Sequence, residues 1–444
     1  MKLTIVFIAL LIYVWLSTFR FRVSLAVYVG FLATALHSVA VIPGQSVVKL
    51  AFPALILGYV AHGVSGSRRT WFDKELGLWT GAFFATALLG LILSGGLGGS
   101  GAKAWQLAGP MALGLIVSVG AREERTLRTI SWGFVGFSSL SAVIAIAQAS
   151  DLAFLAPVAS LTTATDVLDP NRVPGPFNNP NGLAAVLSVS MPLAFVLFAL
   201  EARAVRRVVL ALALAVLGVA LIFTYSRSGW FGATAGILLL LSSKRIRRRV
   251  AVPVALVVGT GVVSYLLLGR DESIAHARIA ELALNTISGV NSVAERLAAW
   301  QKALAIARDH TLLGIGYGNF PSAQIAGRFR WVTGRVTHNV FMTVLAEMGV
   351  VGLGLLVALF VRVFRNLWAG VRCARSTSLS ALSWGFLAAM LSYVVGQGMA
   401  HGSLGSEVMW VLIGLSFAVR SLGADAASSE DRIAREACRE NGRS

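Results

Sequence analysis

Long apolar stretches alternate with short polar connections over most of the chain. A helix that spans a membrane needs about 20 predominantly apolar residues, and stretches of this length recur almost from end to end. The pattern predicts an all-α polytopic bundle with twelve or thirteen crossings. The candidate spans are residues 3–19, 23–42, 47–64, 76–97, 104–120, 129–149, 182–200, 208–225, 228–243, 250–268, 338–361, 380–400 and 404–421.

The crossing count depends on the early segments. Residues 47–64 contain Lys49, Pro53 and His62, which weaken this stretch as a span and make twelve the alternative to thirteen. The first apolar run is longer than the core of a typical signal peptide, and a second run follows almost at once, so we expect it to be retained. The predicted bundle covers residues 1–421, and residues 422–444 form a short polar tail.

Basic residues orient the predicted bundle, because Lys and Arg are enriched in cytoplasmic connections. The strongest cluster, between the spans ending at 243 and starting at 250, consists of Lys244, Arg245, Arg247, Arg248 and Arg249. With this connection in the cytoplasm, other basic connections and the polar tail lie on the same side. Two long segments, 150–181 and 270–337, then lie outside.

The amino-acid composition excludes several classes of protein. Only 13% of the 444 residues are charged and 56% are hydrophobic, whereas soluble proteins carry about 25% charged residues. Soluble enzymes, coiled coils and disordered scaffolds are therefore excluded. The net charge of +18 follows from the basic connections rather than from a nucleic-acid surface. Cys373 and Cys438 both fall on the predicted cytoplasmic side, so no disulfide framework is expected.

The longer outer segment contains a predicted amphipathic helix. Ser292 and Glu295 form a capping-box pattern that opens a helix reaching about Asp309. Arg296 and Trp300 lie four residues apart and share one face of this helix. The segment is basic and adjoins the bilayer, so it suits an anionic ligand, with contact to anionic headgroups as the alternative.

Three polar motifs interrupt the apolar pattern at the outer side. Phe177-Asn178-Asn179-Pro180-Asn181 precedes the span starting near 182, where Asn181 is expected to cap the helix. Thr224–Gly229 forms the outer turn before the span at 228 and contains Arg227; Thr337-His338-Asn339 precedes the span at 338. Taken singly, these motifs also fit a helix cap, an arginine extending to the headgroups, and a histidine bridging backbone groups.

The position of the three motifs favours a common site. Each lies at the outer end of a helix that runs inward, and helix N-termini carry free N–H groups and partial positive charge. With Arg227 and Arg296 added, we expect the helix ends to form a site for a diphosphate or a sulfate type of anion. The same cations disfavour imidazolium, so we expect a neutral His338 that can accept a proton. Glu347, deeper in the last of these helices, is expected to make a polar contact between helices.

Other motifs are missing from the sequence. No glycine-rich phosphate loop with a following Lys-Ser/Thr is present, and no cluster of His, Cys and carboxylates has metal-ligand spacing. We therefore expect no nucleotide, no metal and no cofactor. The energy for any reaction must come with the substrate.

These residues resemble the O-antigen ligase and polymerase superfamily of bacterial multi-pass glycosyltransferases. The resemblance covers roughly residues 170–350 in four ordered blocks. The blocks are Phe177-Asn178-Asn179-Pro180-Asn181; Thr224 with Ser226-Arg227-Ser228-Gly229; Arg296 and Trp300 leading to Leu313-Gly314-Ile315-Gly316-Tyr317-Gly318-Asn319-Phe320; and His338-Asn339 with Glu347 and Gly349.

The resemblance implies a GT-C-like inner-membrane enzyme with twelve helices, cytoplasmic termini and a periplasmic active site. Its members move glycans from undecaprenyl diphosphate, and the ligase branch uses a sugar hydroxyl of the lipid A core as acceptor, completing lipopolysaccharide. We expect inverting, metal-independent transfer. The alternatives are a polymerase or an oligosaccharyltransferase of the same superfamily and, from another class, a flippase or transporter of lipid-linked glycans.

Each candidate residue has an expected role in this reaction. His338 is the expected catalytic base. Arg227 and Arg296, with Arg172 as a third member, are expected to bind the donor diphosphate. The expected supporting residues are Asn178, Asn181, Asn339, Trp300 and Tyr317.

Overall fold

The structure is a computed structural model of the chain. It describes residues 2–34, 40–42, 45–65, 72–93, 97–149, 172–177, 179–268, 292–324, 336–374, 376–396, 398 and 404–441. Most of the first outer segment, and the parts of the second outside 292–324 and 336–337, lie outside the described residues.

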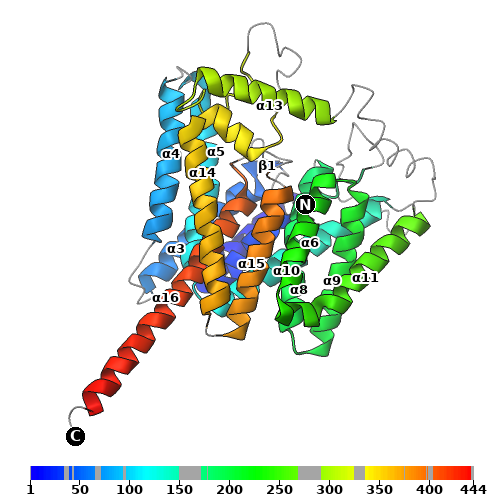
Figure 1. The fold of residues 1–444 in the computed structure, drawn as a ribbon, viewed down its shortest axis with the longest axis vertical. Coiled ribbons are helices and arrows are strands. Elements are labelled where there is room, and N and C mark those ends of the chain that lie inside the picture. The colour runs from blue at the N-terminus through cyan, green and yellow to red at the C-terminus, as the bar shows by residue number, and fades with distance from the viewer. Residues whose placement is uncertain are drawn as a thin grey trace.

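The described chain is a bundle of helices (Figure 1), and each of the predicted apolar stretches coincides at least in part with a helix. The helices are α1 (Lys2–Phe19), α2 (Phe21–Phe31), the 3-10 helix η1 (Leu32–Thr34), α3 (Val47–Ser65), α4 (Lys74–Leu93), α5 (Leu97–Gly120), α6 (Glu124–Ala149), α8 (Pro180–Leu200), α9 (Ala204–Phe223), α10 (Arg227–Ser242), α11 (Lys244–Leu268), α13 (Ser292–Asp309), α14 (Val340–Cys373), α15 (Thr377–Gly396) and α16 (Glu407–Asn441).

Length and composition support a polytopic membrane protein. Within the described residues, seven helices are long and apolar enough to cross a membrane, and four shorter apolar helices accompany them. The count of twelve or thirteen crossings remains a prediction. Residues 422–441, predicted as part of a polar tail, continue α16 as helix to Asn441.

One predicted span is wrong as a continuous helix. Residues 23–42 form α2 and η1 only as far as Thr34, and Ala40–Ile42 is instead a short strand, β1, paired antiparallel with β2 (Gln45–Ser46). The sequence between helix and hairpin contains His37 and Ser38, and Pro43-Gly44 separates the two strands, a pair suited to a tight turn. This hairpin is the departure from an all-helical chain among the described residues.

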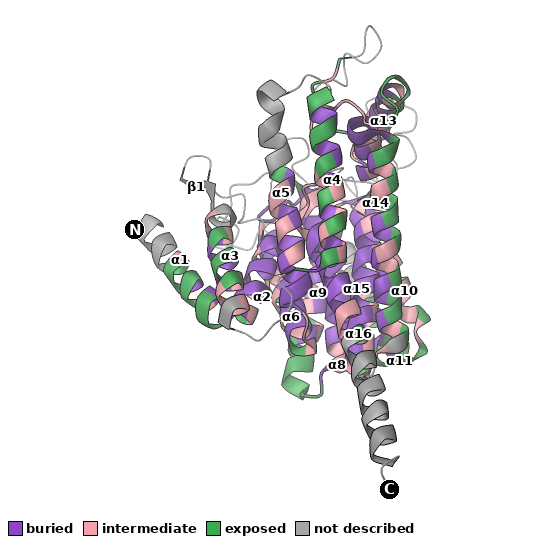
Figure 2. Ribbon diagram, turned by 90° about the vertical axis from the view of Figure 1, so that its left-hand side faces the viewer, coloured by how far each residue is buried: buried purple, intermediate pink, exposed green. Residues whose placement is uncertain are grey.

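The centre of the bundle is formed by α8 and α15. Figure 2 shows buried residues concentrated in the middle of the bundle. In α8, 89% of the residues in its apolar 18-residue stretch are buried. A helix that is apolar on all sides gains most when neighbours surround it. Contacts from α6, α9, α10 and α15 enclose α8.

Small residues bring α10 close to this centre. A Cβ atom on Gly236 would lie 2.1 Å from the Ser392 Oγ of α15 and 2.9 Å from the Pro192 Cγ of α8. A Cβ atom on Gly232 would lie 2.6 Å from the Ser392 carbonyl oxygen. Close backbone approach at small residues is the usual way in which membrane helices pack. It fixes the start of α10 next to the start of α8.

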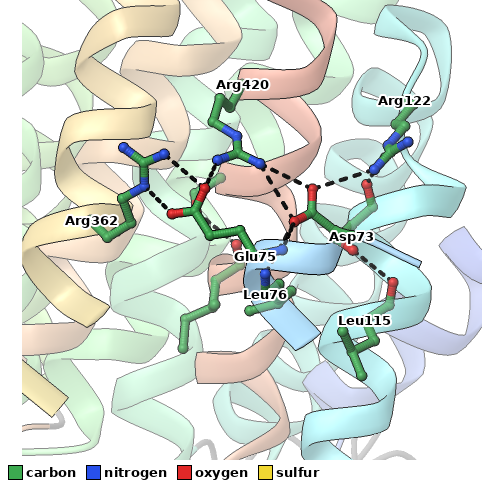
Figure 3. Close-up of polar contacts among 10 residues, drawn as sticks. Asp73, Glu75, Leu76, Leu115, Arg122, Arg362 and Arg420 are labelled. Carbon is green, nitrogen blue, oxygen red and sulfur yellow. Dashed lines mark hydrogen bonds and ion pairs between the residues drawn. The ribbon is translucent and has the colours of Figure 1, made fainter. Parts of the chain in front are cut away.

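An ion-pair network joins four elements at the start of α4 (Figure 3). Asp73 caps α4 by accepting two backbone N–H bonds at 3.1 and 3.0 Å. Its carboxylate also pairs with Arg122 and Arg420, each at 3.3 Å. Glu75 accepts a hydrogen bond from Arg362 Nη2 at 2.8 Å and pairs with Arg420. Arginines at the end of α5, on α14 and on α16 therefore hold the start of α4.

Candidate functional site

The helix predicted over residues 292–309 is confirmed as α13, which lies across one end of the bundle (Figure 1). Its inner face is lined with small and apolar side chains that pack separately from the main core. A small hydrophobic core results, which α13 shares with the turn after it and with α14. Its buried members are Ala298, Ala299, Ala303, Ile306, Phe320 and Ala346. We call these three parts of the chain the outer unit: α13, residues 310–323, and residues 340–348 of α14.

A break in α14 receives the turn that follows α13. Gly349 has φ 63° and ψ −164°, which interrupts the helix. The backbone groups near the break then bond to the turn: Ile315 N–H donates to the Ala346 carbonyl at 3.0 Å, and Val350 N–H donates to the Thr311 carbonyl at 2.9 Å. Because buried backbone groups need partners, the turn and the break stabilise each other.

Replacing Gly349 should disrupt this arrangement. Its backbone conformation is one that almost only glycine adopts, and an added Cβ would lie 2.2 Å from the Leu312 carbonyl oxygen. We expect Gly349→Ala to lower the melting temperature by several degrees, since such strain costs on the order of 1–3 kcal/mol. Gly354→Ala is the matched control, because nothing lies within 4 Å of a Cβ there. Equal melting temperatures for the two variants would contradict this account.

The first and second motifs meet through a polar network at the starts of α8 and α10. Arg172 Nη2 donates to the Asn181 Oδ1 at 2.9 Å, and Arg172 Nε donates to the Thr224 carbonyl at 3.0 Å. Ser226 Oγ donates to the same Asn181 oxygen at 2.8 Å. Residues 45 or more positions apart in the sequence are thus joined at one place. Arg172, the third predicted arginine, lies at the centre of this network.

The predicted helix cap at Asn181 is wrong. Asn179 is the cap of α8, and its side chain accepts a hydrogen bond from the Asn181 N–H at 2.7 Å. Pro180 occupies the first helical position, where its missing N–H costs nothing. This arrangement leaves the Asn181 side chain to bind Arg172 and Ser226. Asn178 lies outside the described residues.

Arg172, Arg227 and Arg296 lie close enough for their charges to affect one another. Arg227 is the exposed first residue of α10, whose cap is Ser226. Arg296 lies half-buried on α13. Burial lowers the pKa of Arg296, and the charges of Arg227 and Arg172 lower it further. Like charges held this close repel one another, so an anion bound among them would be stabilised.

The third motif joins this region through α13. Trp300 Nε1 donates to the Thr337 carbonyl at 3.0 Å, next to His338. Asn339 caps α14 by accepting hydrogen bonds from the N–H groups of residues 341 and 342 at 2.9 and 3.2 Å. His338 has φ 53°, a left-handed conformation uncommon outside glycine. His338 therefore lies directly before the cap of α14, next to the residue that Trp300 of α13 binds.

Tyr317, the remaining supporting residue, is buried in the turn that follows α13. The turn reads Gly314-Ile315-Gly316-Tyr317-Gly318, and its three glycines have φ of 65°, 86° and 77°. These left-handed values explain why glycine alternates here. The tyrosine is therefore held by a backbone that few other sequences would adopt.

Lys302 was not identified by the sequence patterns, and Glu347 has an unexpected partner. Lys302 is fully buried on the inner face of α13, and its Nζ donates to the Phe320 carbonyl at 3.0 Å. Glu347 Oε1 accepts from the Phe320 N–H at 3.0 Å, so it contacts the turn that follows α13. The position of Lys302 among Ala298, Ala299 and Ala303 on the helical wheel is the signal that could have predicted its burial. In the described part of the chain, no three His, Cys, Asp or Glu side chains group as metal ligands would.

Comparisons with known proteins identify the part of the chain that contains most of this site. Residues 210–357 match the family model described as O-Antigen ligase. The match includes Arg227, Arg296 and His338, whereas Arg172 and Asn181 precede it. No curated protein matches the chain. A chain from a solved peptidoglycan synthase complex is similar at 18% identity with a TM-score of 0.41, covering 79% of this chain and 97% of that one. Over residues 210–357, the part that contains Arg227, Arg296 and His338, the chain is therefore similar to the O-antigen ligase family.

Proposed function

We propose that the protein is an O-antigen ligase of the bacterial inner membrane. It transfers a glycan from undecaprenyl diphosphate to a sugar hydroxyl of the lipid A core at the periplasmic face. The observation that carries the proposal is the grouping of Arg172, Arg227 and Arg296 beside the helix end that holds His338. This grouping suits a diphosphate next to a base.

The arginines act on the leaving group. A glycosyl diphosphate already has a good leaving group, so cations that stabilise the charge on the departing oxygen replace a strong general acid. Arg227 is exposed and Arg296 is half-buried, and both are proposed to bind the diphosphate. Arg172 already donates to Asn181 and Thr224, so its part is to hold the starts of α8 and α10 together and add positive charge.

His338 acts on the acceptor. The hydroxyl oxygen of the acceptor attacks the anomeric carbon of the donor while its proton passes to the imidazole of His338. The bond between the anomeric carbon and the diphosphate oxygen breaks, and undecaprenyl diphosphate leaves with the electron pair. A single displacement inverts the anomeric configuration. Asn178, Asn181 and Asn339 shape the helix ends around the reacting groups, with Trp300 and Tyr317 supporting the outer unit.

The polymerase and oligosaccharyltransferase activities of the superfamily differ mainly in the acceptor, so the product formed in cells tests the proposal. In cells lacking the protein, a ligase predicts lipid A core without glycan and an accumulation of the lipid-linked polymer. A polymerase predicts a core that still bears a single repeat unit. A flippase predicts that lipid-linked glycan accumulates on the cytoplasmic side instead.

The proposed orientation places α13 and the three arginines in the periplasm. Cysteines introduced at Thr165, Val290 and Arg330 should react with a membrane-impermeant thiol reagent added to cells with a permeabilised outer membrane. Native Cys373, at the end of α14, should stay protected until the inner membrane is opened. Labelling of Cys373 in cells with an intact inner membrane would reverse the orientation and place the site in the cytoplasm.

The proposed chemistry needs neither a nucleotide nor a metal ion. The purified protein should transfer glycan from undecaprenyl diphosphate in excess EDTA without ATP, because the donor bond supplies the free energy and the arginines supply the positive charge. Product formation is followed by gel mobility of the lipid A core. Complete loss of transfer in EDTA, with recovery on adding one divalent metal, would show that another cation neutralises the leaving group.

A further inference from the structure

Two charged side chains are buried within the outer unit, and the proposed chemistry uses neither of them. Lys302 on α13 is fully buried, and Glu347 on α14 is 3% exposed. Burying a charged group is costly unless it gains strong partners. Burial also lowers the pKa of Lys302, which shows that the surroundings disfavour the ammonium. A lysine buried here is therefore expected to make a contact through its amino group that an apolar side chain could not make.

Both side chains bind the same residue from opposite helices. Lys302 Nζ donates to the Phe320 carbonyl at 3.0 Å and lies 4.6 Å from the centre of the Phe320 ring. Glu347 Oε1 accepts from the Phe320 N–H at 3.0 Å. Phe320 is itself 1% exposed and belongs to the small core of the outer unit. Lys302 on α13 and Glu347 on α14 thus hold the two backbone groups of one buried residue.

This connection lies close to the proposed reacting groups. Arg296 and Trp300 are on α13, six and two residues before Lys302, and Trp300 bonds to the residue preceding His338. Glu347 is the residue whose carbonyl accepts from the Gly316 N–H at 3.0 Å, at the break in α14. Any slide of α13 along α14 would move Arg296 relative to His338 and to Arg227 on α10.

We infer that Lys302 and Glu347 are positioning residues that, by binding Phe320 from both sides, fix α13 on the first part of α14 and place Arg296 relative to His338. The inference rests on the proposed function for the roles of Arg296 and His338. The link through Phe320 itself is independent of that function. Misplacement of catalytic groups by about 1 Å can reduce a rate by about a hundredfold.

Variants that keep or remove one hydrogen bond test this role. Glu347→Gln keeps an oxygen that accepts from the Phe320 N–H, whereas Glu347→Leu removes this acceptor. Lys302→Met removes the amino donor while keeping a side chain of similar length. We expect kcat to fall roughly tenfold to a hundredfold in Lys302→Met and Glu347→Leu, and to stay within about threefold of wild type in Glu347→Gln. The double variant Lys302→Met/Glu347→Leu should be no worse than the worse single variant, because both act through Phe320.

A distance measurement gives a readout that does not depend on transfer. Spin labels at Leu304 on α13 and Thr234 on α10, both exposed, report the position of α13 in a protein with Cys373 and Cys438 replaced by serine. The distance distribution should be narrow in wild type and in Glu347→Gln, and broad in Lys302→Met and Glu347→Leu. Gln301→Met is the matched control, since Gln301 lies next to Lys302 but is exposed.

The outcomes separate the inference from its premise. A lowered kcat with an unchanged distance distribution, or a broadened distribution with normal kcat, would overturn the positioning role. If wild type itself fails to transfer glycan, the proposed function fails, and the distance measurement alone decides whether the pair fixes α13. If Lys302→Met does not fold, Glu347→Gln and Glu347→Leu provide the comparison.

Discussion

Arg296→Ala should lower kcat/KM for the lipid-linked donor by roughly a hundredfold to a thousandfold, the usual effect of removing one group that stabilises developing negative charge. Arg227→Ala should have a comparable effect, because Arg227 and Arg296 lie close enough to depress the pKa of Arg296. Arg→Lys should restore only part of the loss, since lysine lacks the planar fork that binds two phosphate oxygens. Initial rates at varied donor concentration measure the effect.

The structure supplies controls for the arginine variants. Arg308→Ala removes an exposed charge from the last turn of the same helix, and its donor kinetics should remain near those of wild type. Arg172→Ala should also reduce the melting temperature, because Arg172 bridges Asn181 and Thr224. Full activity of Arg296→Lys or Arg227→Lys would mean that a simple point charge is sufficient there. Equal losses in Arg308→Ala and Arg296→Ala would remove Arg296 from the site.

His338→Ala and His338→Gln should abolish glycan transfer while the protein still binds undecaprenyl diphosphate. Loss of a general base costs on the order of a hundredfold to ten-thousandfold in kcat, and the arginines that bind the donor are untouched. His338→Asn is the variant that best preserves the backbone, because asparagine adopts the positive φ of this position more readily than alanine does. Single-turnover transfer and donor-binding measurements separate the two effects.

His310→Ala is the matched control for His338. His310 is exposed just after α13, so its replacement should leave transfer unchanged. Near-normal transfer by purified His338→Asn would exclude His338 as the base. Loss of donor binding in that variant would instead indicate that the imidazole serves the diphosphate.

The sequence predicts those parts of the fold that depend on residues close together along the chain, and it does not predict those that depend on residues far apart. Apolar length located the bundle helices, and the capping box at Ser292 located α13 with its observed bounds. Both are local signals. The break at Gly349 depends on pairing with residues 311–316, more than thirty positions earlier. The apolar pattern is continuous across the break, so periodicity alone predicts an unbroken span there.

In the candidate site, too, local features are predictable from the sequence and contacts between distant residues are not. The motifs around Arg227 and His338 were visible because polar residues interrupt apolar stretches. Asn179 rather than the expected Asn181 caps α8, because Pro180 between the two asparagines occupies the first helical position. The bond from Asn181 to Ser226, 45 residues apart, has no local signal at all.

The ion pairs at the start of α4 have a consequence for the biogenesis of the protein. Arg122 is 49 residues beyond Asp73, Arg362 is 287 residues beyond Glu75, and Arg420 is 347 residues beyond Asp73. A ribosome must therefore synthesise the chain as far as Arg420 before the last cation reaches these carboxylates. The other end of α4, at Gly90, lies against the turn at Leu313 and Gly316. Nascent chains that end before α16 would leave α4 without its last cation, so the support it gives the outer unit is completed only late in translation.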